Sequence, residues 1–483
     1  MEARQHGISV SRPAERLFPG IPEGTLLQVS QTKWLEKDDF DRLAAIPGAF
    51  FAFGLERHLV PAAGNIAFGE WTSTGRWPDP LYIPVAQRHV VEEFFGSRLD
   101  PLFPPESPLD PIAPFKGLDD HGHELRLLPF QAEAVRRLRS LRRGLLRIPT
   151  GRGKTACALA LGNDLLVSGR VDRVVVAAGR LAIRKTWLPE LRRFLAEEPV
   201  VVEGAPSVRR RLWPLARPAR WVLTRYDTWP LPDGRSNIQR LLGPRTLVVI
   251  DEVHHFKNPT TKRWRVYREL LETTKTEYRA FLTATLHYDT PVDSYAPVEL
   301  LGLHVWNTAV EFEDRYFNVD EVSTGRLDWM GRPQRARVVG GLKSPERAAE
   351  LARTLDAVSF HRSVGELGDP TSTTSVDQVV PATDEEEALY GEVVRPVVEA
   401  ALRRANRGNI LPSMTIERLF SDDPVLLLRS DSPTARSVAR TLGARLEAAS
   451  PGSKMRALIV HLANVVETSD SKAAVYSSFV TPL

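Results

Sequence analysis

The sequence predicts an α/β protein built around a parallel sheet with flanking helices. Apolar runs rich in β-branched residues are each followed by a polar or glycine-rich turn and then by a helical pattern. These runs span residues 173–178, 221–224, 247–251 and 280–285. Such runs are typical of strands that are buried on both faces. Their alternation with helices favours a doubly wound sheet, whose functional residues lie beyond the carboxyl ends of the strands.

The composition is that of a globular protein without a disulfide framework. The chain has 483 residues, of which 26% are charged and 42% hydrophobic, and its formal net charge is +4. The single cysteine, Cys157, excludes an intrachain disulfide and a cysteine-rich zinc module. The N-terminus lacks the apolar core of a secretory signal, and no run approaches the ~18 apolar residues of a membrane span. We therefore expect a cytoplasmic protein that does not enter a membrane.

Composition along the chain predicts several parts. Residues 1–98 are rich in proline, glycine and aromatic residues, and we interpret them as a small accessory domain. Six prolines between Leu99 and Leu118 exclude a helix or a central strand, so residues 99–122 are interpreted as a linker. Residues 123–290 form the α/β lobe.

The remaining chain is expected to begin with a mainly helical region, residues 291–430. Within it, residues 384–408 have the pattern of an amphipathic helix that Pro396 should kink or split. Residues 431–483 are treated as a further part, with a helix at 453–467 and a strand at 472–480.

A glycine-rich loop with a following lysine predicts a phosphate-binding site. The segment Ile-Pro-Thr-Gly-Arg-Gly-Lys-Thr (148–155) follows an apolar run and precedes an Ala/Leu-rich helix. Backbone N–H groups of such a loop can surround phosphates at the helix N-terminus, with Thr150, Gly151, Arg152 and Gly153 forming the loop. Lys154 can reach the β- and γ-phosphates, and the Thr155 hydroxyl can bind Mg²⁺. The strict loop pattern requires glycine where this chain has isoleucine.

Two carboxylates at a strand end supply the second half of the site. The strand at 247–251 ends in Asp251 and Glu252. Asp251 can hold Mg²⁺, directly or through water, and Glu252 can orient and deprotonate an attacking water. The negative charges of neighbouring carboxylates repel each other, and a bound metal ion would offset that repulsion. His254 and His255 are more commonly a turn or core pair than zinc ligands, and no other ligand stands at suitable spacing.

At this point the sequence resembles the superfamily 2 helicases and translocases. The resemblance rests on P-T-G-x-G-K-T at 149–155, D-E-x-H at 251–254 and T-A-T at 283–285. Further segments resemble the Swi/Snf-type DNA-dependent ATPases, including Lys257 and Asn258, which generic helicases lack. These segments are residues 125–138, 174–194, 221–229, 251–265, 344–367, 376–393 and 453–462. The resemblance covers roughly residues 123–483.

The resemblance implies a RecA-like P-loop lobe that binds ATP and Mg²⁺. Residues Lys154 and Thr155 would hold phosphate and Mg²⁺, and Asp251 and Glu252 would handle the metal and the water. Gln131, which follows an aromatic residue, would recognise adenine.

The resemblance also implies contacts with DNA, most simply double-stranded DNA. His254, Thr283 and Thr285 would couple the nucleotide state to those contacts. The backbone of the DNA would meet segments 180–186 and 224–226. The residues in question are Arg180, Arg184, Lys185, Thr224 and Arg225. Because the net charge is small, the positive charge that binds DNA must be concentrated locally.

Two-lobed relatives take an arginine finger from a second RecA-like lobe, of which residues 431–483 resemble only the beginning. An arginine finger is worth about 10³–10⁵ in rate, so the sequence predicts that this chain binds ATP but hydrolyses it poorly alone. We expect a translocase completed in trans by a second polypeptide. The alternatives are a non-hydrolysing ATP- and DNA-binding subunit of a split helicase and an RNA or generic DNA helicase subunit.

Overall fold

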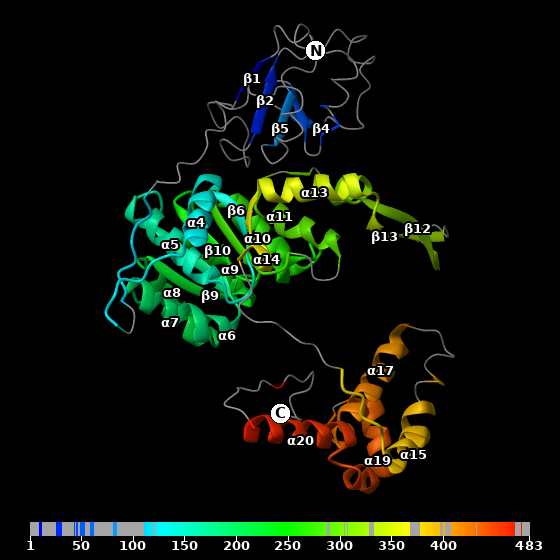
Figure 1. Ribbon diagram of the computed structural model, residues 1–483. Helices are drawn as coiled ribbons and strands as arrows, with labels where there is room; N and C mark the ends of the chain where they lie inside the picture. The colour runs from blue at the N-terminus through cyan, green and yellow to red at the C-terminus, as the bar shows by residue number, and fades with distance from the viewer. Residues whose placement is uncertain are drawn as a thin grey trace. The chain divides into compact units, whose positions relative to one another are not determined.

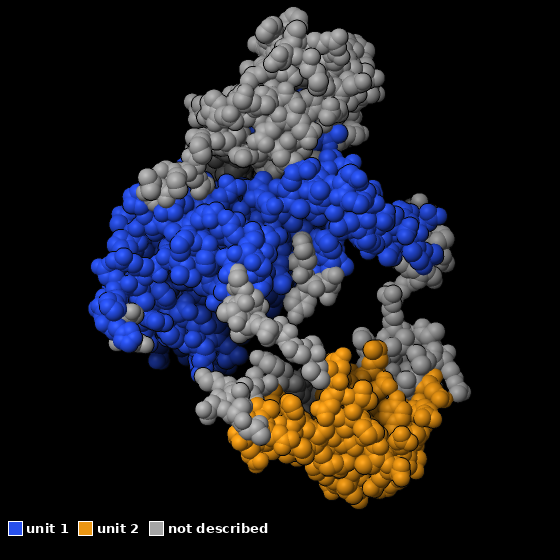
Figure 2. Space-filling view, in the orientation of Figure 1, with its two compact units in different colours: residues 1–370 blue, residues 371–483 orange. Residues whose placement is uncertain are grey.

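The computed structural model describes most of the chain from residue 111 onward and short stretches before it. The described residues are 9–11, 26–30, 43, 45–46, 49–53, 58–61, 81–84, 111–118, 121–286, 290–303, 305–306, 308–327, 333–367, 377–396, 399–400, 407–430, 432–468 and 475. They form two compact units, residues 1–370 and residues 371–483, which Figure 2 colours separately. Each unit is described by itself.

A seven-stranded sheet forms the centre of the first unit. Its order is β14-β6-β11-β10-β7-β9-β8, and every neighbouring pair is parallel. The strands are β6 (Arg143–Arg147), β7 (Arg173–Ala178), β8 (Val200–Val202), β9 (Trp221–Arg225), β10 (Thr246–Ile250), β11 (Tyr278–Thr283) and β14 (Ser359–His361). The predicted α/β class with a parallel sheet is confirmed, and all four predicted strands are present.

Helices cover both faces of this sheet (Figure 1). The helices are α4 (Pro129–Leu141), α5 (Lys154–Val167), α6 (Arg180–Ala182), α7 (Leu188–Leu195), α8 (Pro206–Ala216), α9 (Pro232–Leu241), α10 (Lys262–Thr273), α11 (Tyr295–Leu300), α12 (Ala309–Tyr316), α13 (Pro345–Ala357) and α14 (Val364–Leu367). Along β10, Val249 joins the apolar core shared with α4, α5 and α7, whereas Val248 and Ile250 join the core shared with α8 to α13. Burial on both faces explains the uninterrupted apolar runs.

The sheet continues beyond the lobe that the sequence places at 123–290. Strand β14 pairs in parallel with β6, with Ser359 opposite Leu145. Helix α13 delivers this strand to the edge of the sheet, and its buried Leu351 and Leu355 join the core on that face. The lobe therefore takes an edge strand from a region in which the sequence predicts mainly helix.

A long hairpin also interrupts that region. Strands β12 (Phe317–Leu327) and β13 (Pro333–Leu342) pair antiparallel in a two-stranded sheet. Val322 and Val338 are each 50% exposed, and Arg335 forms an ion pair with Glu321 at 3.3 Å on the surface. Because much of the hairpin is solvated, it has no apolar periodicity that would reveal it in the sequence.

The end of the proline-rich segment packs on the lobe. Residues 111–118 are neither helix nor central strand, and Phe115 is buried with its ring centroid 4.7 Å from that of Phe194. The backbone N–H of Ala113 donates to Asp164 Oδ1 at 3.0 Å, and Asn163 Nδ2 donates to the carbonyl of Pro114 at 3.0 Å. The prolines exclude regular structure, but side-chain partners still fix the path of this segment.

The first hundred residues contribute an antiparallel sheet to the first unit. Its strand order is β1-β2-β5-β3-β4. These strands are β1 (Ser9–Ser11), β2 (Leu26–Ser30), β3 (Phe50–Phe53), β4 (His58–Pro61) and β5 (Leu81–Pro84). Alternate residues of β2 and β5 are fully buried, including Leu27 and Ile83, so the sheet has an apolar face.

The second unit is helical in its described part. It contains α15 (Asp384–Leu389), the π-helix η9 (Tyr390–Val394), α17 (Arg407–Asp422), α18 (Leu426–Arg429), α19 (Pro433–Ala448) and α20 (Ser453–Thr468). The π-helix ends two residues before Pro396, whose ring would clash with the carbonyl of Glu392 in an α-helix. This is the distortion predicted for residues 384–408, although parts of that range lie outside the described residues.

The predicted helix at 453–467 is present as α20. The predicted strand at 472–480 lies outside the described residues apart from Val475. Among the helices that the structure describes, none combines the length and the apolar character needed to cross a membrane.

Candidate nucleotide-binding site

The glycine-rich loop lies at the carboxyl end of β6 and leads into the N-terminus of α5. Gly151 and Gly153 have φ angles of +77° and +83°, which favour glycine. Helix α5 begins at Lys154 without a side-chain cap, and Thr155 follows in its first turn. The first-turn N–H groups of a helix have no partner within the helix and favour anions. The local backbone therefore fits a phosphate.

Gln131 holds the loop against α4. Its Oε1 accepts a hydrogen bond from the backbone N–H of Leu128 at 2.9 Å, and its Nε2 donates to the carbonyl of Arg152 at 3.0 Å. Only 8% of Gln131 is exposed. Both ends of the Gln131 amide thus bind backbone groups of this chain. Gln131 therefore positions the loop, a role that is additional to the predicted contact with adenine.

Gly153→Ala is expected to weaken nucleotide binding by about tenfold or more. A Cβ at Gly153 would lie 2.4 Å from Nε2 of Gln131, and its φ of +83° would strain an L-residue. Gly151→Ala is the matched control, because its φ is similar but no atom lies within 4 Å of its added Cβ. Titration with a fluorescent ATP analogue compares the two. Equal losses in both variants would show that backbone strain, and not the contact with Gln131, sets the affinity.

Lys154 and Glu252 meet above the sheet, although β11 separates their strands. Lys154 Nζ lies 4.0 Å from Glu252 Oε1 and donates to the carbonyl of Ile148 at 3.4 Å. Lys154 is 9% exposed. Glu252 follows β10 in the left-handed region at φ +44°, an uncommon conformation for a non-glycine residue that turns its side chain away from the strand direction. The structure thus brings together the predicted phosphate-binding and water-activating residues.

Asp251 is more deeply buried than Glu252. Its Oδ2 accepts a hydrogen bond from Trp187 Nε1 at 2.8 Å, and its Oδ1 accepts one from the N–H of Glu252 at 3.0 Å. Burial raises the pKa of Asp251, while the hydrogen bond from Trp187 opposes that rise and the charge of Glu252 adds to it. A carboxylate that has lost water but keeps lone pairs is suited to a divalent cation.

His254 connects Glu252 to the T-A-T segment. Its Nδ1 lies 3.2 Å from Glu252 Oε2 and 3.3 Å from Thr283 Oγ1. Thr283 donates in turn to the carbonyl of Thr285 at 2.6 Å. The hydrogen bond from His254 lowers the pKa of Glu252; burial opposes this, and Lys154 assists it. Glu252 is therefore an ionised carboxylate at neutral pH that is linked to the end of β11.

The residues predicted to contact DNA differ in their availability. Arg180 and Lys185 are exposed. Arg184 donates to Glu203 Oε1 from Nε at 2.8 Å and from Nη2 at 2.5 Å, and Arg225 lies 3.5 Å from Asp227. These two arginines already have carboxylate partners for which a phosphate must compete.

Thr224, which is also predicted to contact DNA, has a side chain that is not exposed. Thr224 is fully buried, its hydroxyl donates to the carbonyl of Val176 at 3.2 Å, and it accepts a hydrogen bond from Trp229 Nε1 at 2.8 Å. Strands β7 and β9 are neighbours in the middle of the sheet, so this side chain faces the core.

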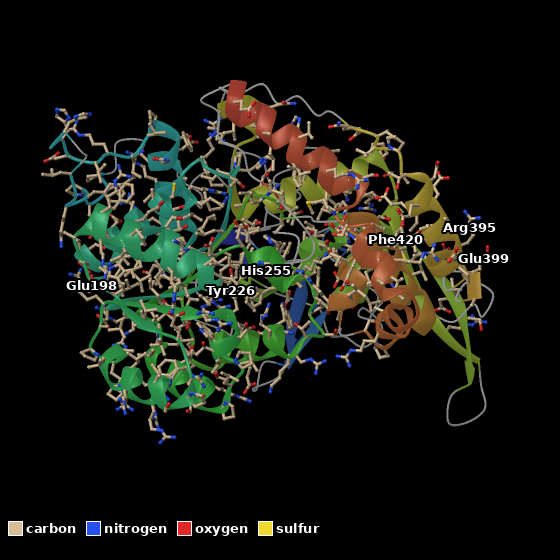
Figure 3. The ribbon with its side chains drawn as sticks, turned by 90° about the horizontal axis from the view of Figure 1, so that it is seen from below. Glu198, Tyr226, His255, Arg395, Glu399 and Phe420 are labelled. Carbon is tan, nitrogen blue, oxygen red and sulfur yellow. The ribbon has the colours of Figure 1, made fainter. Side chains whose placement is uncertain are left out.

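Sequence reasoning assigned no role at the site to Trp187 or Tyr226. Trp187 donates from its indole to the carboxylate of Asp251. Tyr226 donates its hydroxyl proton to the backbone carbonyl of Asp251 at 2.5 Å. Its ring lies against His255, as Figure 3 shows, with ring centroids 5.6 Å apart. The spacing of Trp187 within a family-like segment was the available signal, but it does not reveal a contact across the sheet.

The residues fit Mg²⁺ held jointly with nucleotide phosphates. Among the described residues, no group of three or more His, Cys, Asp or Glu side chains could hold a metal. Mg²⁺ commonly binds one or two carboxylates together with substrate phosphates and water. Asp251 and the Thr155 hydroxyl are suitable ligands of that kind.

Comparison with known proteins agrees with this geometry. Residues 124–288 match the model of the family described as the res subunit of type III restriction enzymes. The matched segment contains the loop, both carboxylates and the T-A-T segment.

A curated relative and two solved structures are also similar to the chain. The relative is the DNA 3′-5′ translocase XPB2 of Sulfurisphaera tokodaii, 25% identical over 240 residues, which are 49% of this chain and 47% of the relative. The chain thus spans about half the length of the curated relative it matches. The structures are the Sulfolobus solfataricus SWI2/SNF2 ATPase core with double-stranded DNA, at 20% identity, and the core domain by itself, at 18%. Their TM-scores are 0.40 and 0.38, covering 67% and 66% of this chain and 64% of each structure.

Proposed function

We propose that this protein is an ATP-dependent DNA translocase that couples hydrolysis to movement on, or remodelling of, duplex DNA. The observation that carries the proposal is the meeting of Lys154 and Glu252, 4.0 Å apart, in front of the uncapped N-terminus of α5. An ammonium, free helix amides and an ionised carboxylate together suit transfer of a phosphoryl group to water. The superfamily 2 relative that is named a DNA 3′-5′ translocase supports DNA as the partner.

The residues of the loop bind and orient the triphosphate in this proposal. Lys154 and the first-turn amides of α5 balance the phosphate charge, and Thr155 and Asp251 hold Mg²⁺. Bound Mg²⁺ would neutralise charge on the phosphate oxygens. Glu252 orients the attacking water and accepts its proton. Its lowered pKa keeps the carboxylate ready to do so.

The cations at the carboxyl ends of β7 and β9 supply the proposed DNA surface. Arg180 and Lys185 are exposed, and Arg225 is half-buried. Arg180 and Lys185 follow β7, and Arg225 ends β9. Because these strands are neighbours, the cations lie at the same edge of the sheet. Phosphate contacts of this kind position a duplex without reading its sequence.

The proposal is tested by ATP turnover of the purified 483-residue chain, with and without duplex DNA. We expect slow turnover by this chain alone, which DNA stimulates. We expect Lys154→Ala to weaken nucleotide binding by about tenfold or more, because the ammonium is lost from a buried phosphate site. Nucleotide binding that never leads to turnover would instead support an ATP-gated DNA-binding subunit. A wild-type chain that binds no nucleotide would overturn the proposal.

A further inference from the structure

We propose that Trp187 is a positioning residue through which DNA binding and Mg²⁺–ATP binding influence each other. This inference rests on the proposed function and adds the physical connection between its two ligands. The connection is the hydrogen bond between the Trp187 indole and the carboxylate of Asp251.

The hydrogen bond joins two fully packed groups. Trp187 is fully buried, Asp251 is 8% exposed, and Nε1 lies 2.8 Å from Oδ2. A buried carboxylate with little access to water depends on such donors for its orientation. A shift of the indole therefore turns or releases the side chain that is proposed to hold Mg²⁺.

Trp187 ends a segment that carries exposed cations. The π-helix η5 spans Ile183–Trp187, and the backbone N–H of Leu188 donates to the carbonyl of Ile183, five residues earlier. Arg184 and Lys185 lie on the same turn and are exposed to solvent. A phosphate bound by these cations acts on the backbone element that places the indole.

A π-turn gives this element a second available arrangement. It contains one more residue than an α-turn, and each residue of an α-helix turns the chain by about 100°. Relaxation of η5 to α-geometry would therefore rotate Trp187 relative to Arg184 and Lys185. In the present arrangement Arg184 is bound to Glu203. A DNA phosphate that draws Arg184 away would shift the equilibrium between the π- and α-geometries of η5.

The second segment, which carries the half-buried Arg225, supports the backbone of Asp251. Arg225 ends β9, and the next residue, Tyr226, donates its hydroxyl proton to the carbonyl of Asp251 at 2.5 Å. Because this bond fixes the main chain, the side chain of Asp251 is the part left to respond to Trp187. Both proposed DNA-contacting segments thus converge on one residue.

A binding cycle with Trp187→Phe tests the inference. The dissociation constant of a fluorescent ATP analogue with Mg²⁺ is measured without and with saturating duplex DNA, and that of DNA is measured reciprocally. For the wild type we expect a change of about fivefold or more, equal in both directions. Trp187→Phe keeps an aromatic ring but loses the N–H donor. In this variant we expect each ligand to change the dissociation constant of the other by no more than about twofold. The variant should bind the Mg²⁺–analogue alone more weakly than the wild type, because Asp251 loses the donor that orients it, whereas the affinity for DNA alone should stay within about threefold.

Trp213→Phe is the matched control. Trp213 is also buried, and its Nε1 donates to Asp233 Oδ2 at 3.3 Å, between α8 and α9. Its replacement removes an indole–carboxylate bond of the same kind away from the site, so the coupling should remain. Loss of coupling in both variants would indicate a general response to losing a buried indole and would overturn the inference.

Omission of Mg²⁺ tests the same connection in the unaltered protein. If Asp251 communicates through the metal, the wild-type coupling should fall toward unity with the analogue alone. Coupling that persists without Mg²⁺, or that survives in Trp187→Phe, overturns the inference while the proposed function stands. A wild type that binds either ligand but shows no coupling overturns it as well, and one that binds neither overturns both.

Discussion

Glu252→Gln is expected to reduce ATP turnover by about 10²–10⁴-fold while nucleotide binding remains within a few-fold of the wild type. A positioned general base contributes about that much to a rate. The hydrogen bond from His254 lowers the pKa of Glu252, so the wild-type group is a carboxylate at neutral pH. Glutamine keeps the size of the side chain but accepts no proton. Lys154, 4.0 Å away, remains free to balance phosphate charge.

Single-turnover hydrolysis and analogue titration separate the two effects. Glu190→Gln is the matched control, because Glu190 is a half-buried carboxyl on α7 whose pKa is raised by burial and, more weakly, by the charge of Asp251. It has no assigned role in the chemistry, so its replacement should change turnover by less than about tenfold. If Glu252→Gln retained wild-type turnover, another group would have to accept the proton from water.

The pH dependence of turnover follows from the same carboxylate. Because the pKa of Glu252 is lowered in the folded protein, the basic form persists as the pH falls below the usual range of a glutamate. Loss of activity on acidification should therefore begin at lower pH than for an unperturbed carboxyl. In His254→Asn, which removes the main cause of the lowered pKa, the acidic limb of the pH–rate profile should move to higher pH. An unchanged limb would assign it to a different group.

The central sheet was predictable because of how parallel strands are buried. Each internal strand meets helices on both faces, so runs such as 173–178 and 247–251 are apolar throughout and are recognisable without any knowledge of their neighbours. The glycine loop is equally local, since its conformation and its lysine are encoded within a few residues. These signals were enough to predict the fold class and to place the glycine loop at the N-terminus of a helix.

Elements that depend on distant partners were not predictable in this way. Strand β14 has three residues and is defined by its pairing with β6, more than two hundred positions earlier. Trp187 and Asp251 are 64 positions apart and meet only because the sheet brings the ends of β7 and β10 together. The burial of the Thr224 side chain was not predictable either, because a threonine near a strand end can face the core or the solvent and sequence alone does not distinguish the two.

Arg279→Met is expected to destabilise the first unit by about 3 kcal/mol or more. Arg279 is 2% exposed and lies at the start of β11. Its guanidinium donates to the backbone carbonyls of Leu271, Thr276, Leu300 and Leu301, at 2.8–3.2 Å. Three of these carbonyls belong to the C-terminal ends of α10 and α11, where no helical partner is available. The carbonyls of Thr276 and Leu301 keep a hydrogen bond from Arg143, and that of Leu271 keeps one from the N–H of Thr276. The variant nevertheless loses every bond from the Arg279 guanidinium, and a hydrogen bond to a charged group contributes about 1.5–3 kcal/mol.

The loss should appear in the thermal midpoint of the first unit. About 3 kcal/mol corresponds to roughly 6–12 °C for a domain of this size. Burial lowers the pKa of Arg279 to about 9, so the guanidinium remains charged at neutral pH and a neutral side chain is not its equivalent. Arg245→Met is the control, because Arg245 pairs with Asp172 at 2.7 Å on the exposed surface, where ion pairs contribute little.

The two arginine variants also separate stability from function. Arg279 binds carbonyls at the amino end of β11, whereas Thr283, which meets His254, ends the same strand at the site. Below the unfolding transition, Arg279→Met should therefore bind the ATP analogue as the wild type does, even though its midpoint is lower. A midpoint no lower than that of Arg245→Met would mean that water replaces the guanidinium between the helix ends. Weaker analogue binding at low temperature would mean that strand β11 transmits the change along its length.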